Sequence, residues 1–309
     1  MTCRRLQIPN RLRDPSLILA LVGQQVLVIF LLEYTQRTSA EEFSIPVAVC
    51  FTEVLKLATC IGVASTSAGW HTVVHSIRKS NWKLAIPSLL YVFQNQLVYI
   101  GAKNLPPIAF STLSQLKTLA CALFSKLLLK SPIGQWRGCA LVILTVGVVL
   151  VIASQIPKVE EEEYHTRGVV AVLVACATSG FSSAFMEHVY KSSKNEETLW
   201  IRNAQLSLLS LPAITCCLFD RASHPVSTVA SVFHSSSILA LIFLQAIGGL
   251  LVGAIMKYMS AVVKCYASTL AICCCALLSR VQSPHSLPWQ TLIGVGLVVS
   301  SIFMYGRRD

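Results

Sequence analysis

The chain has few charged residues for its length. Only 13% of its 309 residues are Asp, Glu, Lys or Arg, and 54% are hydrophobic. Soluble domains carry about 25% charged residues, and the mean hydropathy here is +0.64. This shortage of charge excludes a soluble globular domain and predicts an all-α protein embedded in a membrane.

The common catalytic motifs are also missing from the sequence. It contains no HExxH, no GxSxG, no P-loop and no glycine-rich dinucleotide turn. Its seven histidines do not cluster with carboxylates, and the spacing of its twelve cysteines matches no zinc pattern. We therefore expect no enzyme, metal or cofactor.

Long apolar runs fill most of the chain. A membrane-spanning helix needs about 20 largely apolar residues, and this rule predicts ten spans. They are 15–35, 43–65, 84–102, 107–129, 137–155, 168–190, 199–219, 236–257, 261–280 and 288–306. The cysteines lie in these spans or, like Cys3, in the N-terminal tail. We expect them to be small core residues and predict no disulfide framework.

The net charge of +11 is distributed unevenly over the loops. Basic residues concentrate in the segments that share a side with the N-terminus, for example Arg4, Arg78, Lys130, Lys191 and Arg307. The positive-inside rule therefore predicts that both termini are cytosolic. Because the basic charge reflects topology, it gives no reason to expect nucleic-acid binding.

The sequence resembles itself when it is shifted by about half its length. Residues 121–126 then align with 275–280, and Glu33, Arg37 and Lys103 meet Glu187, Lys191 and Lys257. This predicts two five-helix repeats, 15–155 and 168–306, with cytosolic ends at 1–14 and 307–309 and an acidic lumenal linker at 156–167. An odd number of spans inverts the second copy, as in secondary transporters. Duplicated hydropathy without functional symmetry is the alternative.

Two lysines lie in or beside the apolar runs. Lys117 is in the middle of the run 110–129, and Lys264 is near the start of the run 261–280. A lysine near the centre of a membrane helix costs roughly 2.5 to 3.5 kcal/mol, and such residues usually face a protein-lined cavity. Two such cations predict a cavity that holds an anion.

Other polar residues inside the predicted spans are further candidates. Tyr91, Gln94 and Asn95 share one face of the third span. They could bind a base or sugar, or they could link helices through hydrogen bonds. Asn203 and Gln205, near the start of the seventh span, are cavity candidates.

Glu53 and Lys56 lie three positions apart in the second span. They can neutralise each other, because residues at this spacing are neighbours on a helix. A structural ion pair and a gating or substrate site both remain open for them.

Seven stretches together resemble the nucleotide-sugar transporter family of the drug/metabolite transporter superfamily. They are VAVCFTEVLKL (47–57), PSLLYVFQNQLVYIG (87–101), QLKTLACALFS (115–125), SGFSSAFMEHVYK (179–191), LWIRNAQL (199–206), GGLLVGAIMKY (248–258) and VVKCYAST (262–269). They extend in order over nearly the whole chain. The most similar branch carries CMP-sialic acid, UDP-galactose and UDP-N-acetylglucosamine.

This resemblance implies an antiporter of the Golgi or endoplasmic-reticulum membrane. It would import a UDP-sugar or CMP-sialic acid by alternating access and export the nucleoside monophosphate. The resemblance leaves open a homodimer or an association with glycosyltransferases. Another phosphorylated or organic-anion substrate, or a non-transporting Golgi scaffold, is the alternative.

The family's binding residues map onto several positions of this sequence. Lys117 and Lys264 match lysines that contact the substrate phosphates, and Asn203 matches an asparagine of the seventh helix. Tyr91, Gln94 and Asn95 match residues of the nucleotide pocket, and we add Gln205 and Ser268 from the same stretches. The family often has tyrosine where this chain has Phe110, Ser114 and Ser207.

Overall fold

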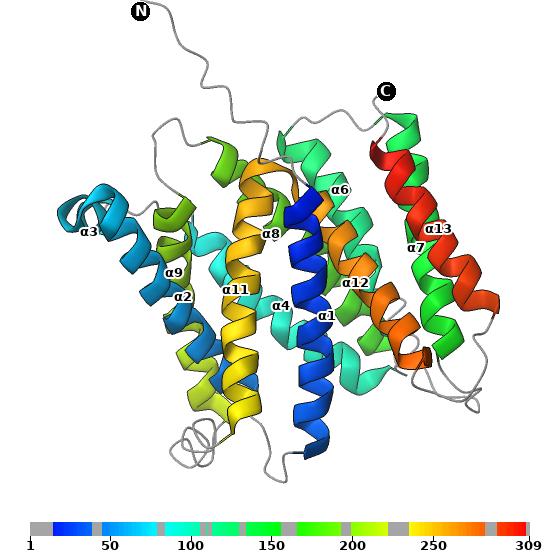
Figure 1. The fold of residues 1–309 in the computed structure, drawn as a ribbon, viewed down its shortest axis with the longest axis horizontal. Coiled ribbons are helices and arrows are strands. Elements are labelled where there is room, and N and C mark those ends of the chain that lie inside the picture. The colour runs from blue at the N-terminus through cyan, green and yellow to red at the C-terminus, as the bar shows by residue number, and fades with distance from the viewer. Residues whose placement is uncertain are drawn as a thin grey trace, which may run out of the picture.

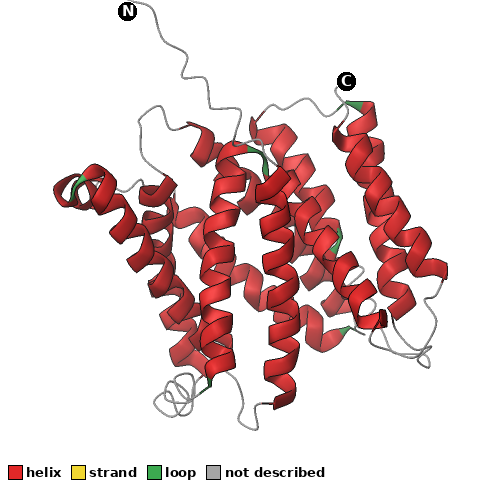
Figure 2. Cartoon of the chain, in the orientation of Figure 1, coloured by secondary structure: helices red, strands yellow, loops and turns green. Residues whose placement is uncertain are grey.

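The computed structural model describes residues 15–38, 45–78, 84–105, 110, 113–129, 134–155, 166–192, 199–221, 235–281 and 289–306. Within these ranges the chain is almost entirely helical, as the red ribbons of Figure 2 show. The helices are α1 (Pro15–Thr38), α2 (Ile45–Ala68), α3 (Trp70–Arg78), α4 (Ala85–Asn104), α6 (Leu116–Leu129), α7 (Gln135–Gln155), α8 (Thr166–Ser192), α9 (Leu199–Arg221), α11 (Ser236–Tyr258), α12 (Ala261–Val281) and α13 (Trp289–Gly306).

Six of the described helices are long and apolar enough to cross a membrane. Their apolar segments are Pro15–Leu32, Val47–Ser67, Gln135–Ala153, Thr166–Lys191, Ser236–Tyr258 and Ala261–Leu278. Helix α13 has a shorter apolar segment, and α4 and α9 contain amide or charged residues that lower their hydropathy. The chain is therefore a polytopic membrane protein built from helices, as the composition predicts.

Helix α3 has no counterpart among the predicted spans. Gly69 ends α2 with a φ of 80°, a left-handed conformation that glycine adopts without strain. Its carbonyl then accepts the Val73 N–H at 3.2 Å, which starts α3. Val73 is buried, whereas Trp70 is 60% exposed. With nine residues, α3 is too short to span a membrane and packs along the end of the bundle.

The first helix of the chain packs mainly against the second half. Helix α1 contacts α11 and α12, which lie far from it in the sequence (Figure 1). Gln24 Nε2 donates to the Leu244 carbonyl of α11 at 3.0 Å, and its amide lies where a side chain at Gly248 would collide with it. Helix α8 conversely packs on α4 and α6.

Helices α7 and α13 form a tight pair at one edge of the bundle (Figure 1). Their backbones approach closely at Gly147 and Gly294: a β-carbon at position 294 would lie 2.6 Å from the Gly147 carbonyl oxygen. Small residues permit such contacts between membrane helices. The pair borders a buried cluster with α6 and α12 that includes Cys121, Leu144 and Cys265.

Several parts of the sequence prediction lie outside the described residues. These are the tail 1–14, most of the linker 156–167, the end 307–309 and the side chain of Asn95. Helix α1 begins and helix α13 ends at the same end of the bundle, at the top of Figure 1.

Candidate functional site

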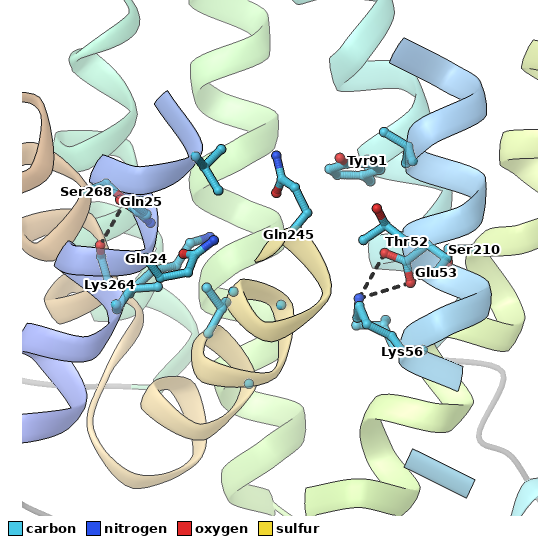
Figure 3. Close-up of a pocket in the computed structure, with 18 of the residues that line it drawn as sticks. Gln24, Gln25, Thr52, Glu53, Lys56, Tyr91, Ser210, Gln245, Lys264 and Ser268 are labelled. Carbon is cyan, nitrogen blue, oxygen red and sulfur yellow. Dashed lines mark hydrogen bonds and ion pairs between the residues drawn. The ribbon is translucent and has the colours of Figure 1, made fainter. Parts of the chain in front are cut away.

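A cavity of about 670 Å³ lies among the helices. Its lining comes from α1, α2, α4, α6, α8, α9, α11 and α12, so both sequence halves contribute to it. Figure 3 shows polar side chains on opposite walls, with Lys264 and Ser268 on one wall and Tyr91 and Glu53 on the other. The predicted site residues that line the cavity are Glu53, Lys56, Tyr91, Lys117, Asn203, Lys264 and Ser268.

Lys264 is held in the first turn of α12 by two capping contacts. Ser260 Oγ accepts the Val263 N–H at 3.3 Å, which satisfies one of the free donors at the helix start. The buried Glu187 carboxylate of α8 accepts the Ala261 N–H at 2.7 Å. A carboxylate is also favourable at a helix N-terminus because of the helix dipole. These contacts fix the turn that carries Lys264.

Lys264 and Lys117 are cations without a carboxylate partner in the described part of the chain. Lys264 Nζ donates to the Ser183 hydroxyl at 3.4 Å, a long and weak hydrogen bond. Both lysines line the cavity from half-buried positions on different helices, α12 and α6. A partly buried ammonium without a counter-charge favours an anionic ligand.

Ser268 and Gln25 join α12 to α1 beside Lys264. Gln25 Nε2 donates to Ser268 Oγ at 3.1 Å, and Ser268 Oγ lies 3.2 Å from the Lys264 carbonyl one turn earlier. Gln245 of α11 extends into the space between the two walls in Figure 3. This wall therefore offers amide and hydroxyl groups next to a cation.

The opposite wall contains an ion pair. Lys56 Nζ lies 2.9 and 3.0 Å from the two Glu53 carboxylate oxygens, and the side chains are 10% and 16% exposed. Ser210 Oγ of α9 adds a contact of 3.4 Å to Glu53. Tyr91 faces the same part of the cavity (Figure 3). Since Glu53 neutralises Lys56, the unbalanced charge of the cavity comes from the other two lysines.

Asn203 is fixed by contacts from three helices. The Tyr190 hydroxyl donates to Asn203 Oδ1 at 3.1 Å, and Asn203 Nδ2 donates to the Leu199 carbonyl at 3.0 Å. A β-carbon at Gly253 of α11 would lie 2.8 Å from both amide atoms. Glycine at this position therefore leaves the room that the buried asparagine occupies.

The sequence matches a model of the nucleotide-sugar transporter family over residues 10–306, which is nearly the whole chain. The chain belongs to the nucleotide-sugar transporter family. The family predicted from the seven sequence stretches is thus confirmed, and the charged cavity lies in a transporter.

Characterised relatives resemble the transporter over most of its length. The UDP-galactose/UDP-N-acetylglucosamine transporter of Caenorhabditis elegans is 30% identical over 304 residues, 95% of this chain and 82% of its own. The human UDP-galactose translocator is 31% identical over 311 residues, which cover 96% of this chain and 77% of the translocator. The human UDP-N-acetylglucosamine transporter is 29% identical over 307 residues, 93% of each chain.

A solved crystal structure has the same fold as the transporter. It superposes with a TM-score of 0.71 and covers 94% of this chain and 95% of its own. Its sequence identity is only 13%, so the similarity concerns the arrangement of the helices alone.

Two predicted site residues of the transporter do not line the cavity. Gln205 is 1% exposed, and its Nε2 donates to the Ser76 carbonyl at 2.8 Å, which ties α9 to α3. Gln94 is half-buried on α4 and is not among the lining residues. Tyr91 of the predicted third-span group does line the cavity.

The polar residues of α1 and α11 are cavity residues that the sequence prediction does not include. Gln24, Gln25 and Gln245 lie within long apolar runs and line the cavity of the transporter. Gln94 is a candidate because an unpaired amide inside a membrane is costly. The same argument would have predicted Gln24, Gln25 and Gln245 as cavity residues. Thr52 and Ser183 also line the cavity. A Thr or Ser hydroxyl can donate to a carbonyl of its own helix, so its presence in an apolar run does not predict a cavity.

The positions where the family often has tyrosine lie away from the cavity lining. Phe110 packs against the apolar cluster of Leu105, Val172 and Cys176. Ser114 Oγ donates to the Phe110 carbonyl at 2.7 Å. Ser207 is fully buried on α9, and its hydroxyl has no hydrogen-bond partner among the described residues.

Proposed function

We propose that this transporter exchanges a UDP-linked sugar, UDP-galactose or UDP-N-acetylglucosamine, for UMP across the Golgi membrane. The names of the relatives from worm and human support the uridine nucleotide and the neutral sugar. CMP-sialic acid, which the wider branch carries, is the competing substrate. The absence of an ATP-binding motif from the sequence supports exchange as the driving force.

The observation that carries the proposal is the positive charge of the cavity. Three lysines and one glutamate line it, and Glu53 is already paired with Lys56. Lys117 and Lys264 therefore leave the lining with an excess of two positive charges. Keeping an ion out of water costs several kcal/mol, and one favourable charge pair at 4 Å returns about 4 kcal/mol at an effective dielectric constant of 20. A diphosphate would offset both lysines.

The neutral polar groups support a ligand with two chemically different ends. Gln25 and Ser268 adjoin Lys264 on one wall, and Tyr91 and Thr52 adjoin the neutral ion pair on the other (Figure 3). A nucleotide sugar presents a charged centre flanked by a base and a hydroxyl-rich ring. We propose that the two lysines hold the phosphates and that the amide and hydroxyl groups hold the neutral ends.

Alternating access would follow from an inverted repeat. We propose ten membrane spans in two halves, 15–155 and 168–306, with both termini in the cytosol and the linker 156–167 in the lumen. The helix contacts support a two-fold relation: α1 packs on α11 and α12, whereas α8 packs on α4 and α6. The second helices, α2 and α9, and the last helices, α7 and α13, pair with each other. Halves related in this way can rock around a central site.

The test is exchange by purified protein in proteoliposomes preloaded with UMP, CMP or GMP. Preloaded UMP should stimulate uptake of UDP-galactose or UDP-N-acetylglucosamine. Lys117→Ala should lower this exchange about tenfold or more, which corresponds to about 1.4 kcal/mol of lost binding. Lys126→Ala, at an exposed position of the same helix, is the matched control and should exchange normally.

Binding is measured in parallel by thermal unfolding. A ligand at 100 times its dissociation constant adds about 2.7 kcal/mol of stability, so UMP should raise the melting temperature of the wild type and of Lys126→Ala. Normal exchange by a folded Lys117→Ala variant would refute the phosphate role. Stimulation by CMP instead of UMP would assign the competing substrate, and no response to any nucleotide would reject the transport proposal.

A further inference from the structure

Three residues of α8 contact the junction between α11 and α12. Ser183, Glu187 and Lys191 lie four residues apart, so they follow one face of the helix from the cavity toward the end of α8. Ser183 lines the cavity and accepts a hydrogen bond from Lys264 Nζ at 3.4 Å. One turn further, Glu187 Oε2 accepts the N–H of Ala261, three residues before Lys264, at 2.7 Å. These two contacts place the Glu187 carboxylate beside the lysine that we assign to the substrate phosphates.

Glu187 nevertheless does not pair with Lys264. Its Oε2 atom is bound to the backbone of α12, and its Oε1 atom accepts a hydrogen bond from Lys191 Nζ. The Glu187 side chain is 4% exposed, and a carboxylate that is buried to this extent needs a partner. Within the part of the chain that the structure describes, Lys191 is the cation that forms the ion pair. Lys264 therefore keeps its charge although an anion lies one helical turn from the serine that it contacts.

Lys191 is held in this position by the end of α11. Met259 follows that helix with a φ of −122° and a ψ of −108°, and Lys191 Nζ donates to its carbonyl at 2.8 Å. The helix dipole favours a cation at the C-terminus of α11 and an anion at the N-terminus of α12, which are the positions of Lys191 and Glu187. Lys191 does not line the cavity, and its side chain is 39% exposed. It thus balances the carboxylate from outside the site.

We propose that Lys191 keeps Glu187 from neutralising Lys264 and so reserves that lysine for the substrate. This rests on the proposed phosphate role of Lys264. The cavity has an excess of two positive charges, of which Lys264 supplies one. Without Lys191, Lys264 is the cation that the contacts of α8 place next to the buried carboxylate. Their pairing would halve the excess charge and make Glu187 a competitor of the phosphates. Lys191 is therefore a positioning residue, because it acts on the substrate through Glu187.

The experiment measures UMP binding and exchange by the full-length protein with Lys191→Met. This change removes the charge and keeps an unbranched side chain. The dissociation constant for UMP should rise about tenfold, which corresponds to about 1.4 kcal/mol, and the KM of exchange should rise with it. Saturating nucleotide should restore the maximum rate, because phosphate and Glu187 compete for one lysine. Lys126→Met, at an exposed position of α6, is the matched control and should leave both constants unchanged.

The double variant Lys191→Met/Glu187→Gln separates competition from a loss of structure. A glutamine amide can still accept the Ala261 N–H but has no charge that neutralises Lys264, so the double variant should regain the UMP affinity that Lys191→Met loses. If Lys191 only fastens α8 to the junction, the double variant should bind no better than Lys191→Met, and this result would overturn the proposal. Lys191→Gln retains a donor for the Met259 carbonyl and should show the same loss and recovery if Lys191→Met does not fold.

Melting without nucleotide tests the new pairing independently of transport. Lys264→Met should destabilise Lys191→Met more than it destabilises the wild type, since only the variant uses Lys264 to balance Glu187. Equal changes in the two backgrounds would overturn the proposal. Normal UMP binding by a folded Lys264→Met variant would instead reject the phosphate role of Lys264. Loss of UMP binding in Lys264→Met, together with wild-type binding by Lys191→Met, would overturn the role of Lys191 and leave the proposed function standing.

Discussion

Gly253 offers a direct test of how the backbone of α11 shapes the cavity. The substitution Gly253→Ala adds one methyl group whose carbon would lie 2.8 Å from both amide atoms of Asn203 and 3.1 Å from the Tyr190 hydroxyl. Real β-carbons essentially never show contacts below 3.0 Å. The Asn203 side chain, 2% exposed, must therefore move or α11 must shift away from it.

The expected cost has two parts. Overpacking a buried site costs about 1 to 3 kcal/mol. Moving Asn203 also breaks its hydrogen bonds to Tyr190 and to the Leu199 carbonyl, and each of these is worth about 0.5 to 1.5 kcal/mol. We expect Gly253→Ala to destabilise the protein by about 2 kcal/mol or more. If Asn203 binds the nucleotide, the affinity for UMP should fall about tenfold for each 1.4 kcal/mol of lost contact.

The assay combines thermal unfolding with titration of UMP. The control Gly62→Ala adds a methyl group on α2 where no atom lies within 4 Å, and it should melt at or slightly above the wild-type temperature because alanine favours helix. The double variant Gly253→Ala/Asn203→Ala should be little less stable than Asn203→Ala alone, since the colliding amide is gone. Additive losses, or a Gly253→Ala variant as stable as Gly62→Ala, would refute the steric reasoning.

Two further predictions concern stability. Gly294→Ala places a carbon 2.6 Å from the Gly147 carbonyl oxygen and should lower the melting temperature by separating α7 from α13. The control Gly296→Ala, on the same helix, meets no atom within 4 Å and should leave the melting temperature unchanged. Equal melting temperatures would contradict the close approach of these helices. Lys56→Met leaves the largely buried Glu53 carboxylate unpaired and should cost about 3 kcal/mol, and the added change Glu53→Gln should restore most of this in the same melting assay. A double variant no more stable than Lys56→Met would show that the ion pair is not the cause.

The sequence predicts the membrane class and the helices well because both depend on composition over long windows. A run of about 20 apolar residues is a strong signal, and each predicted span overlaps a helix of the structure. The sequence analysis did not predict helix α3, because its nine residues are too few to form an apolar run of that length. Its start depends on the positive φ of Gly69, which sequence alone does not fix.

The sequence predicts some residues of the candidate site correctly and others not. Lys117 and Lys264 stand out because a charge in an apolar run is costly, and both line the cavity. Gln205 has the same kind of sequence signal but bonds to the Ser76 carbonyl of α3. Whether a polar side chain in a span faces a cavity or a neighbouring backbone depends on helix rotation, which hydropathy does not determine.

The sequence by itself determined that this chain is a helical membrane protein of the nucleotide-sugar transporter family and that two cations interrupt its apolar helices. These are properties of composition and of local motifs. Only the tertiary structure decided that Gln25 joins Ser268 beside Lys264, that Glu53 neutralises Lys56, and that Gln205 donates to the Ser76 carbonyl. These contacts, apart from the ion pair within α2, join helices more than a hundred residues apart. They exist because the α1–α12 and α3–α9 interfaces bring distant parts of the backbone together. A pattern in the linear sequence does not give the distance between such helices.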